Sequence, residues 1–114
     1  MPIFHKLYDF TIAASNAVER FPKKDRHTVG MRIQTTTLDL IISLLRANEE
    51  YGVKRQIILK EMSIFLDLLK ILIRLAKDTR AMPEKQYIHL QEKLQEIGRM
   101  LGGWIKSLQT KNPA

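Results

Sequence analysis

Residues 57–76, IILKEMSIFLDLLKILIRLA, decide the fold of this chain. If this stretch is a helix with 100° per residue, its apolar positions cover about 230° of the circumference, whereas a surface helix needs a stripe of about 100°. Apart from Glu61, the remaining polar positions form one narrow strip, made of Lys60, Ser63, Asp67, Lys70 and Arg74 and continued by Lys77. Such a helix is buried on several sides and is mostly cationic on the last. The pattern therefore predicts an assembled scaffold that contacts something anionic, rather than an enzyme.

Composition predicts a single soluble domain spanning residues 1–114. The chain has no cysteine, which excludes disulfides and thiolate metal sites and favours a cytoplasmic location. We expect no signal peptide, because the first residues lack an apolar run after a basic region. We also expect no membrane span, because residues 57–76 carry five charged side chains.

The net charge is +7, and it is unevenly distributed along the chain. Residues 1–52 contribute +1 and residues 53–114 contribute +6. A solvated lysine-rich surface explains such a surplus as well as a nucleic-acid or acidic protein partner does. The charge alone therefore leaves these alternatives open.

Four helices are predicted, at about residues 2–20, 25–48, 53–80 and 83–109, with no strand. Pro22 ends the first helix, and Asp25 is the expected N-cap of the second. Gly52 is expected in the left-handed region between the second and third helices, and Pro83 suits the first turn of the fourth. Short connections predict an all-α, antiparallel up-down-up-down four-helix bundle.

Helical spacing also groups side chains on particular faces. In the first helix one face carries Phe4, Leu7, Tyr8, Thr11, Ala14, Ser15 and Val18, and the second helix has Met31, Leu38, Ile41, Ile42 and Leu45 at helical spacing. The third helix has two adjacent seams with alternating spacings of four and three. The first seam, expected in the core, is Ile58, Met62, Phe65, Leu69, Leu72 and Ala76. The second, available to a neighbouring subunit, is Ile64, Leu68, Ile71 and Leu75.

No set of residues predicts catalysis or a metal site. The three histidines lie on different segments, and the nearest metal pattern is His89-x-x-Glu92 with Glu96. A di-metal carboxylate bundle needs Glu-x-x-His pairs, which this chain lacks. We therefore expect no cofactor, no metal and no enzymatic activity.

Gly98 and Gly102 are four residues apart on one face of the fourth helix, where glycine costs about 1 kcal/mol relative to alanine. We expect them to allow close helix packing, including packing between subunits, with Trp104 as an anchor near that contact. The alternative is that Gly102 and Gly103 end the helix. Apolar periodicity continuing through Trp104 and Leu108 argues against it.

The best binding candidate is the cationic ridge, which we define as Lys70, Arg74 and Lys77. These side chains lie within about 60° of arc, and Arg80 follows one turn later. Their alignment favours a weakly sequence-specific and salt-dependent contact with a phosphate backbone. Asp67 and Asp78 provide the alternative, a salt-bridged and solvated face.

Three stretches together resemble a known family: residues 21–33 (FPKKDRHTVGMRI), 74–78 (RLAKD) and 96–105 (EIGRMLGGWI). They are similar to the accessory variability determinant (Avd) proteins of diversity-generating retroelements. These belong to a wider group that includes the proteins encoded by intervening sequences of bacterial 23S ribosomal RNA. The resemblance covers nearly the whole chain.

This resemblance implies a noncatalytic, homopentameric, barrel-like assembly of four-helix bundles that binds a retroelement reverse transcriptase and template RNA or cDNA during mutagenic retrohoming. The family's functional basic positions on the third helix correspond to Lys70 and Arg74. The expected binding set is Lys60, Lys70, Arg74, Lys77, Arg80 and Arg99, and the expected oligomer interface is Gly98, Gly102, Trp104, Ile64, Leu68 and Ile71. The alternative is a bundle adaptor that binds only proteins.

Overall fold

The computed structural model describes the backbone of residues 1–111 and side chains up to residue 109. The helices are α1 (Pro2–Glu19), α2 (Lys23–Asp25), the π-helix η1 (Arg26–Gly30), α3 (Met31–Glu49), α4 (Gly52–Asp78) and α5 (Glu84–Lys111). Because α2, η1 and α3 follow one another without a break, the chain forms four long helical segments. Residues 1–111 contain no strand. The prediction of an all-helical, four-helix chain is confirmed.

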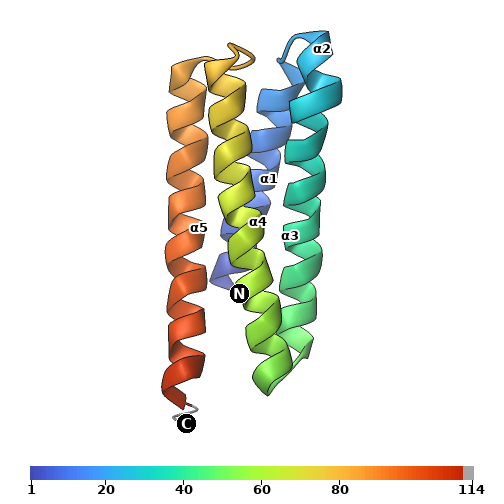
Figure 1. Cartoon of the computed structure of the whole chain (residues 1–114). Coiled ribbons are helices and arrows are strands. Elements are labelled where there is room, and N and C mark those ends of the chain that lie inside the picture. Colours follow the sequence, from blue (N-terminus) through green and yellow to red (C-terminus); the bar gives the residue numbers. More distant parts are fainter. Residues whose placement is uncertain (112–114) are drawn as a thin grey trace.

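The four segments lie side by side in a rod of 49 × 21 × 21 Å (Figure 1). The connection from α1 to α2 and the connection from α4 to α5 lie at one end of the rod, and the short turn from α3 to α4 lies at the other. Within the described part of the chain, no helix is long and apolar enough to cross a membrane.

The second helical segment begins earlier than predicted and does so without the expected cap. It starts at Lys23, directly after Pro22, and the N–H groups of Asp25 and Arg26 donate to the Pro22 carbonyl at 2.9 and 3.1 Å. The Asp25 side chain makes no capping hydrogen bond. The proline, by fixing an extended backbone before the helix, supplies the start that the sequence pattern assigned to Asp25.

Gly52 and Gly30 occupy positions that disfavour any residue with a side chain, each for a different reason. Gly52 has φ +57° where α4 begins, as its predicted left-handed role requires. Gly30 is buried where the second helical segment crosses α1, and a Cβ there would lie 2.7 Å from Val18 Cγ1. The absence of a side chain at Gly30 therefore permits the close approach of these two helices.

The core face of α4 agrees with much of the first predicted seam. Four of its residues are buried, namely Ile58, Met62, Leu69 and Ala76, whereas Phe65 and Leu72 are only half-buried. Leu59, Leu66 and Ile73 complete the buried face instead. The true core face is thus rotated by a fraction of a turn from the seam.

The face predicted for the second helix is mostly wrong, because only Ile41 of its five apolar residues packs against the core. Met31, Leu38, Ile42 and Leu45 each leave just over half of their surface exposed. The core instead takes the opposite face, formed by Ile33, Thr36, Thr37, Leu40, Ser43, Leu44 and Ala47. Burying these polar side chains is inexpensive because they can bond to the preceding turn, as the Thr37 hydroxyl does to the Ile33 carbonyl at 2.7 Å.

The predicted face of α1 is partly wrong in the same way. Leu7, Ala14 and Val18 are buried as expected, but Tyr8 and Ser15 are exposed. The remaining buried positions are Ile3, Phe10 and Ala17. The core face of α1 is therefore turned toward the side that carries Phe10.

Candidate nucleic-acid interface

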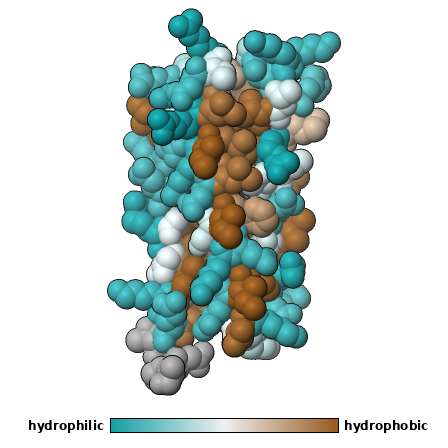
Figure 2. All heavy atoms as spheres, in the orientation of Figure 1, coloured by the Kyte–Doolittle hydropathy of each residue, from teal (hydrophilic) through white to brown (hydrophobic). Residues whose placement is uncertain are grey.

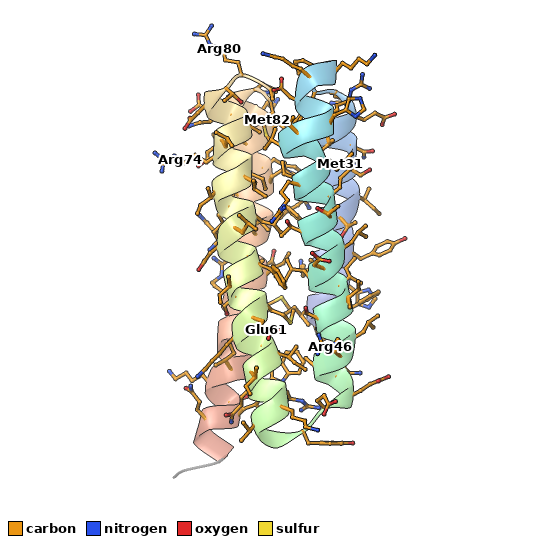
Figure 3. The ribbon with its side chains drawn as sticks, turned by 45° about the vertical axis from the view of Figure 1, so that its right-hand side comes forward. Met31, Arg46, Glu61, Arg74, Arg80 and Met82 are labelled. Carbon is orange, nitrogen blue, oxygen red and sulfur yellow. The ribbon has the colours of Figure 1, made fainter. Side chains whose placement is uncertain are left out.

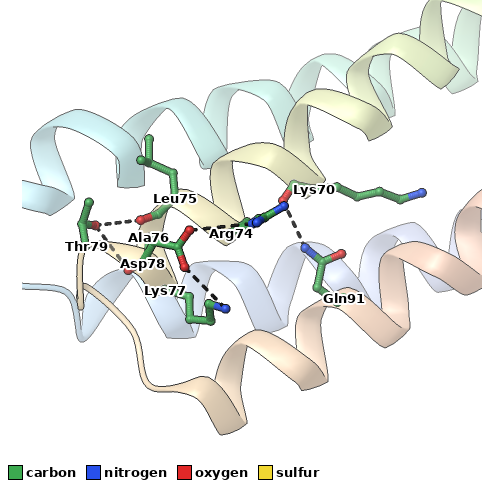
Figure 4. Close-up of polar contacts among 8 residues, drawn as sticks. All are labelled: Lys70, Arg74, Leu75, Ala76, Lys77, Asp78, Thr79 and Gln91. Carbon is green, nitrogen blue, oxygen red and sulfur yellow. Dashed lines mark hydrogen bonds and ion pairs between the residues drawn. The ribbon is translucent and has the colours of Figure 1, made fainter.

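Lys70 lies at the packed boundary between α4 and α5 rather than on an open face. Its backbone carbonyl accepts a hydrogen bond from Gln91 Nε2 of α5 at 3.1 Å (Figure 4). Its Nζ atom lies 3.8 Å from where a Cβ on Gly98 would be, and the residue is half-buried. Lys70 thus reaches across α5 while keeping its charge at the surface.

Arg74 and Lys77 share one carboxylate. Arg74 Nε lies 3.7 Å from Asp78 Oδ2, and Lys77 Nζ lies 3.4 Å from Asp78 Oδ1 (Figure 4). The Arg74 side chain is 71% exposed, whereas that of Lys77 is only 29% exposed. Exposed pairs of this kind contribute roughly 0–1 kcal/mol, so Arg74 can exchange Asp78 for a phosphate at little cost.

Lys77 also contacts an aromatic ring of α5. Its Nζ lies 4.6 Å from the centroid of the Tyr87 ring, a cation–π geometry that holds the side chain against α5. The cationic ridge is therefore uneven. Arg74 projects into solvent, and Lys70 and Lys77 lean toward α5.

An open hollow of about 400 Å³ lies between α4 and α5 below the ridge. Lys70, Asp67 and Ser63 line it from α4, and Gly98, Arg99 and Gly102 line it from α5. The expected close helix packing at the two glycines does not occur inside this chain. A Cβ on Gly98 would have only Lys70 Nζ within 4 Å, and a Cβ on Gly102 would have no neighbour at that distance.

The six predicted binding residues therefore fall into separate places. Lys70 and Arg99 border the hollow, while Arg74 and Lys77 lie toward the α4–α5 turn. Arg80 lies in that turn and points away from the rod (Figure 3). Lys60 is exposed about 15 Å further along α4 from Lys70, at 1.5 Å per residue.

The predicted interface residues are also divided. Ile64 and Ile71 are 67% and 63% exposed on the outer face of α4, with Leu68 half-buried beside them. Figure 2 shows the broken apolar band that runs along α4. Gly98 and Gly102 instead border the hollow on α5. The six residues therefore do not form one continuous surface.

Trp104 contacts Arg55 within its own chain. The Arg55 guanidinium lies 5.7 Å from the Trp104 ring centroid and 5.7 Å from that of Tyr51. Arg55 Nε also donates to the Ala47 carbonyl at 2.9 Å. Arg55 thus links the end of α3 and the start of α4 to α5, and Trp104 is part of that link.

We call the apolar residues exposed on the outer face of α4 the α4 stripe: Val53, Ile57, Ile64, Ile71 and Leu75. A second exposed apolar set lies where helical spacing alone does not distinguish a buried face from an exposed one. This α1/α3 surface lies on two neighbouring helices and comprises Tyr8, Ile12, Leu38, Ile42 and Leu45. The signal was present, since the α3 residues follow a seam spaced by four and three.

The described residues contain no group of three His, Asp or Glu side chains that could hold a metal ion. Glu96, the last member of the sequence pattern considered for metal binding, forms an ion pair with Lys6 at 3.1 Å instead.

Comparison with known protein families gives a match over nearly the whole chain, although no curated protein matches it. A family model described as bAvd-like matches residues 1–108, which include most of all four helical segments. The resemblance seen in the three sequence motifs thus extends over the whole bundle, and the chain belongs to the bAvd-like family.

Proposed function

We propose that this chain is a noncatalytic, cytoplasmic accessory subunit of a diversity-generating retroelement. It binds the reverse transcriptase and template RNA or cDNA through a basic surface, needs no cofactor, and supports mutagenic retrohoming. The observation that carries this proposal is the bAvd-like match over residues 1–108. The net charge of +7 supports it, because a polyanionic partner gains affinity from each cation that it meets.

Arg74 is the first residue that we assign to nucleic-acid or reverse-transcriptase contact. It is the most exposed member of the cationic ridge, and its only ion pair in the described chain is the long one to Asp78. Lys70 and Arg99 flank the hollow and extend the same surface onto α5. Lys60, Lys77 and Arg80 complete the assigned set.

The test compares two double variants with an equal reduction in charge. Lys70→Gln with Arg74→Gln removes two of the three ridge cations, and Arg46→Gln with Lys54→Gln removes two exposed cations elsewhere. Removing one phosphate contact lowers the slope of log K against log salt by about 0.7 for a single strand. We therefore expect a slope lower by about 1.4 for the ridge variant only. Equal RNA binding by both variants would refute the assignment of Lys70 and Arg74 to nucleic-acid contact.

Binding to the polymerase needs a separate experiment. The chain should co-purify with the reverse transcriptase of its own retroelement, and template RNA should strengthen the complex. Loss of co-purification in the ridge variant, with normal helicity by circular dichroism, would place the polymerase contact on the same surface. Failure of the wild-type chain to retain the polymerase contradicts this part of the proposal.

We also propose that the chain, an antiparallel bundle, assembles into a homo-oligomer, with five subunits expected from the family. Two apolar surfaces on different sides of the bundle support this, namely the α4 stripe and the α1/α3 surface. Different surfaces that meet head to tail produce a closed ring when the rotation closes, whereas a two-fold dimer uses one surface twice. Gly102 at the hollow remains a candidate contact with a neighbouring subunit.

Oligomer mass tests this proposal directly. Ile64→Lys with Ile71→Lys places charge within the α4 stripe and should yield monomers by sedimentation. Ile88→Lys is the matched control, because Ile88 is exposed on α5 outside both apolar surfaces. A monomeric wild-type chain, or an unchanged mass in the stripe variant, refutes it.

The rival function is an adaptor that binds only proteins. The occupied state of Lys77 favours it, because a cation already held by Tyr87 and Asp78 has less to offer a phosphate. No retention of RNA or DNA at physiological salt, combined with capture of a protein partner, would select this rival.

A further inference from the structure

The surplus of positive charge collects at one end of the rod. Residues 19–32 and 74–85 hold nine Lys or Arg against four Asp or Glu, which is a net charge of +5 out of the chain's +7. Both segments lie at the end where α1 leads into α2 and α4 leads into α5 (Figure 1). The two segments are more than 40 residues apart in the sequence, so their charges come together only in the folded chain. We call this surface the basic end.

Most cations of the basic end have no acidic partner. Asp78 pairs with Arg74 and Lys77. The other seven are exposed and form no ion pair with any described residue: Arg20, Lys23, Lys24, Arg26, Arg32, Arg80 and Lys85. Their charges are thus available to a ligand.

Arg80 adds an independent observation. Its φ is +67°, and it occupies the left-handed position just after α4, where glycine is usual. The N–H groups of Ala81 and Arg80 close the helix on the carbonyls of Ala76 and Lys77, at 2.8 and 3.0 Å. Glycine would make the same bonds without a strained backbone. An arginine at this strained position therefore suggests a role for its side chain outside folding.

The chemistry of the basic end favours phosphate over a protein surface. Of the large apolar side chains in segments 19–32 and 74–85, Met31 and Leu75 are exposed, and Leu75 already belongs to the α4 stripe, whereas Phe21 and Met82 are buried. Protein interfaces rely on apolar and aromatic anchors at their centre, whereas the basic end exposes two large apolar side chains against seven cations that form no ion pair. One strand of a duplex that crosses a face 21 Å wide presents about six phosphates at 3.4 Å per charge.

We propose that the basic end binds the phosphodiester backbone of RNA or DNA as a second contact surface, separate from the hollow between α4 and α5. This inference rests on the proposed function, because it assumes that the chain binds nucleic acid at all. It adds that the strand continues from Arg74 over the α4–α5 turn to the connection between α1 and α2. Because only the backbone is contacted, binding is independent of base sequence.

The experiment measures fluorescence anisotropy of labelled oligouridine and oligothymidine across a series of salt concentrations. Lys23→Gln with Lys24→Gln tests the basic end, and Arg46→Gln with Lys54→Gln is the control of equal charge. We expect the first variant to bind about 25-fold more weakly at 0.1 M salt, from about five-fold per contact. The control should match the wild type.

Arg80→Gly is the second variant, and it separates binding from folding. Glycine relieves the positive φ, so the variant should melt no lower than the wild type while binding about five-fold more weakly. RNA affected more than DNA would assign the surface to template RNA, and equal effects would assign it to either strand.

The outcomes distinguish this inference from the function on which it rests. If Lys70→Gln with Arg99→Gln, both at the hollow and outside the basic end, weakens binding while both basic-end variants match the control, the basic end is refuted and the proposed function stands. If the wild-type chain binds neither oligonucleotide, both are refuted. Binding of poly-glutamate but not of the oligonucleotides at the basic end also overturns the inference, in favour of an acidic protein.

Discussion

Gly30 is where a single methyl group should have the largest effect on this fold. A Cβ at Gly30 would lie 2.7 Å from Val18 Cγ1 and 3.1 Å from the Asp25 carbonyl oxygen. Val18 is buried and branched at Cβ, so it cannot rotate away freely. Overpacking of this kind costs about 1–3 kcal/mol. Because alanine gains about 1 kcal/mol over glycine in a helix, we expect Gly30→Ala to destabilise the fold by up to about 2 kcal/mol net.

Urea unfolding followed by circular dichroism, at one fixed protein concentration, measures this destabilisation. Val18→Ala in the same chain removes the clashing methyl and completes a double-mutant cycle. We expect the double variant to be more stable than the sum of the single effects by about 1 kcal/mol or more. An unchanged or raised stability for Gly30→Ala, or additive effects in the cycle, would show that the close approach of the two helices is not limiting.

Three further predictions concern other parts of the bundle. Arg55→Ala should cost about 2 kcal/mol by removing the charged hydrogen bond to the α3 terminus and the cation–π interaction with Trp104, measured by urea unfolding, and lysine should recover only part. Leu69→Ala in the core should cost about 2–5 kcal/mol, and Leu75→Ala on the α4 stripe should cost about 0.5 kcal/mol or less in a monomeric background. Gly102→Leu should dissociate the oligomer, as seen by native mass, if a neighbour packs there, whereas Gly103→Leu should not.

The sequence was sufficient for the helices because their start and stop signals are local. Pro22 and Gly52 act on the backbone of their immediate neighbours, so each could be interpreted without knowing the rest of the structure. Gly102 and Gly103 were correctly passed over as a helix end, because α5 continues to Lys111. Helix existence and approximate bounds followed from these signals.

The direction of each helix face could not be found in the same way. The second helical segment carries apolar residues on two opposite sides, and hydropathy favours the side with Leu38 and Ile42. The core takes the side with Thr36 and Thr37, because hydroxyls that bond to the preceding turn can be buried. Which side faces inward depends on the other helices, which the local pattern does not encode.

The positive charge of the binding surface could be predicted from the sequence, but the set of residues that belongs to it could not. Spacing along one helix brought Lys70, Arg74 and Lys77 together, but it could not show that Tyr87 of α5 holds Lys77. It also could not join Lys24 to Arg80, since their proximity to one end arises only when the chain doubles back. The net charge at each end of the bundle therefore depends on connections that are far apart in the sequence.

The contact between Arg55 and Trp104 gives this protein a built-in optical reporter. Trp104 is the only tryptophan of the chain, and it lies beside a cation at the end where α3 turns into α4. Its emission therefore reports whether the C-terminal half of α5 is docked on that turn. Because this site is at the opposite end of the rod from Arg80, a change in emission on adding a ligand to the basic end would reveal motion transmitted along the whole bundle.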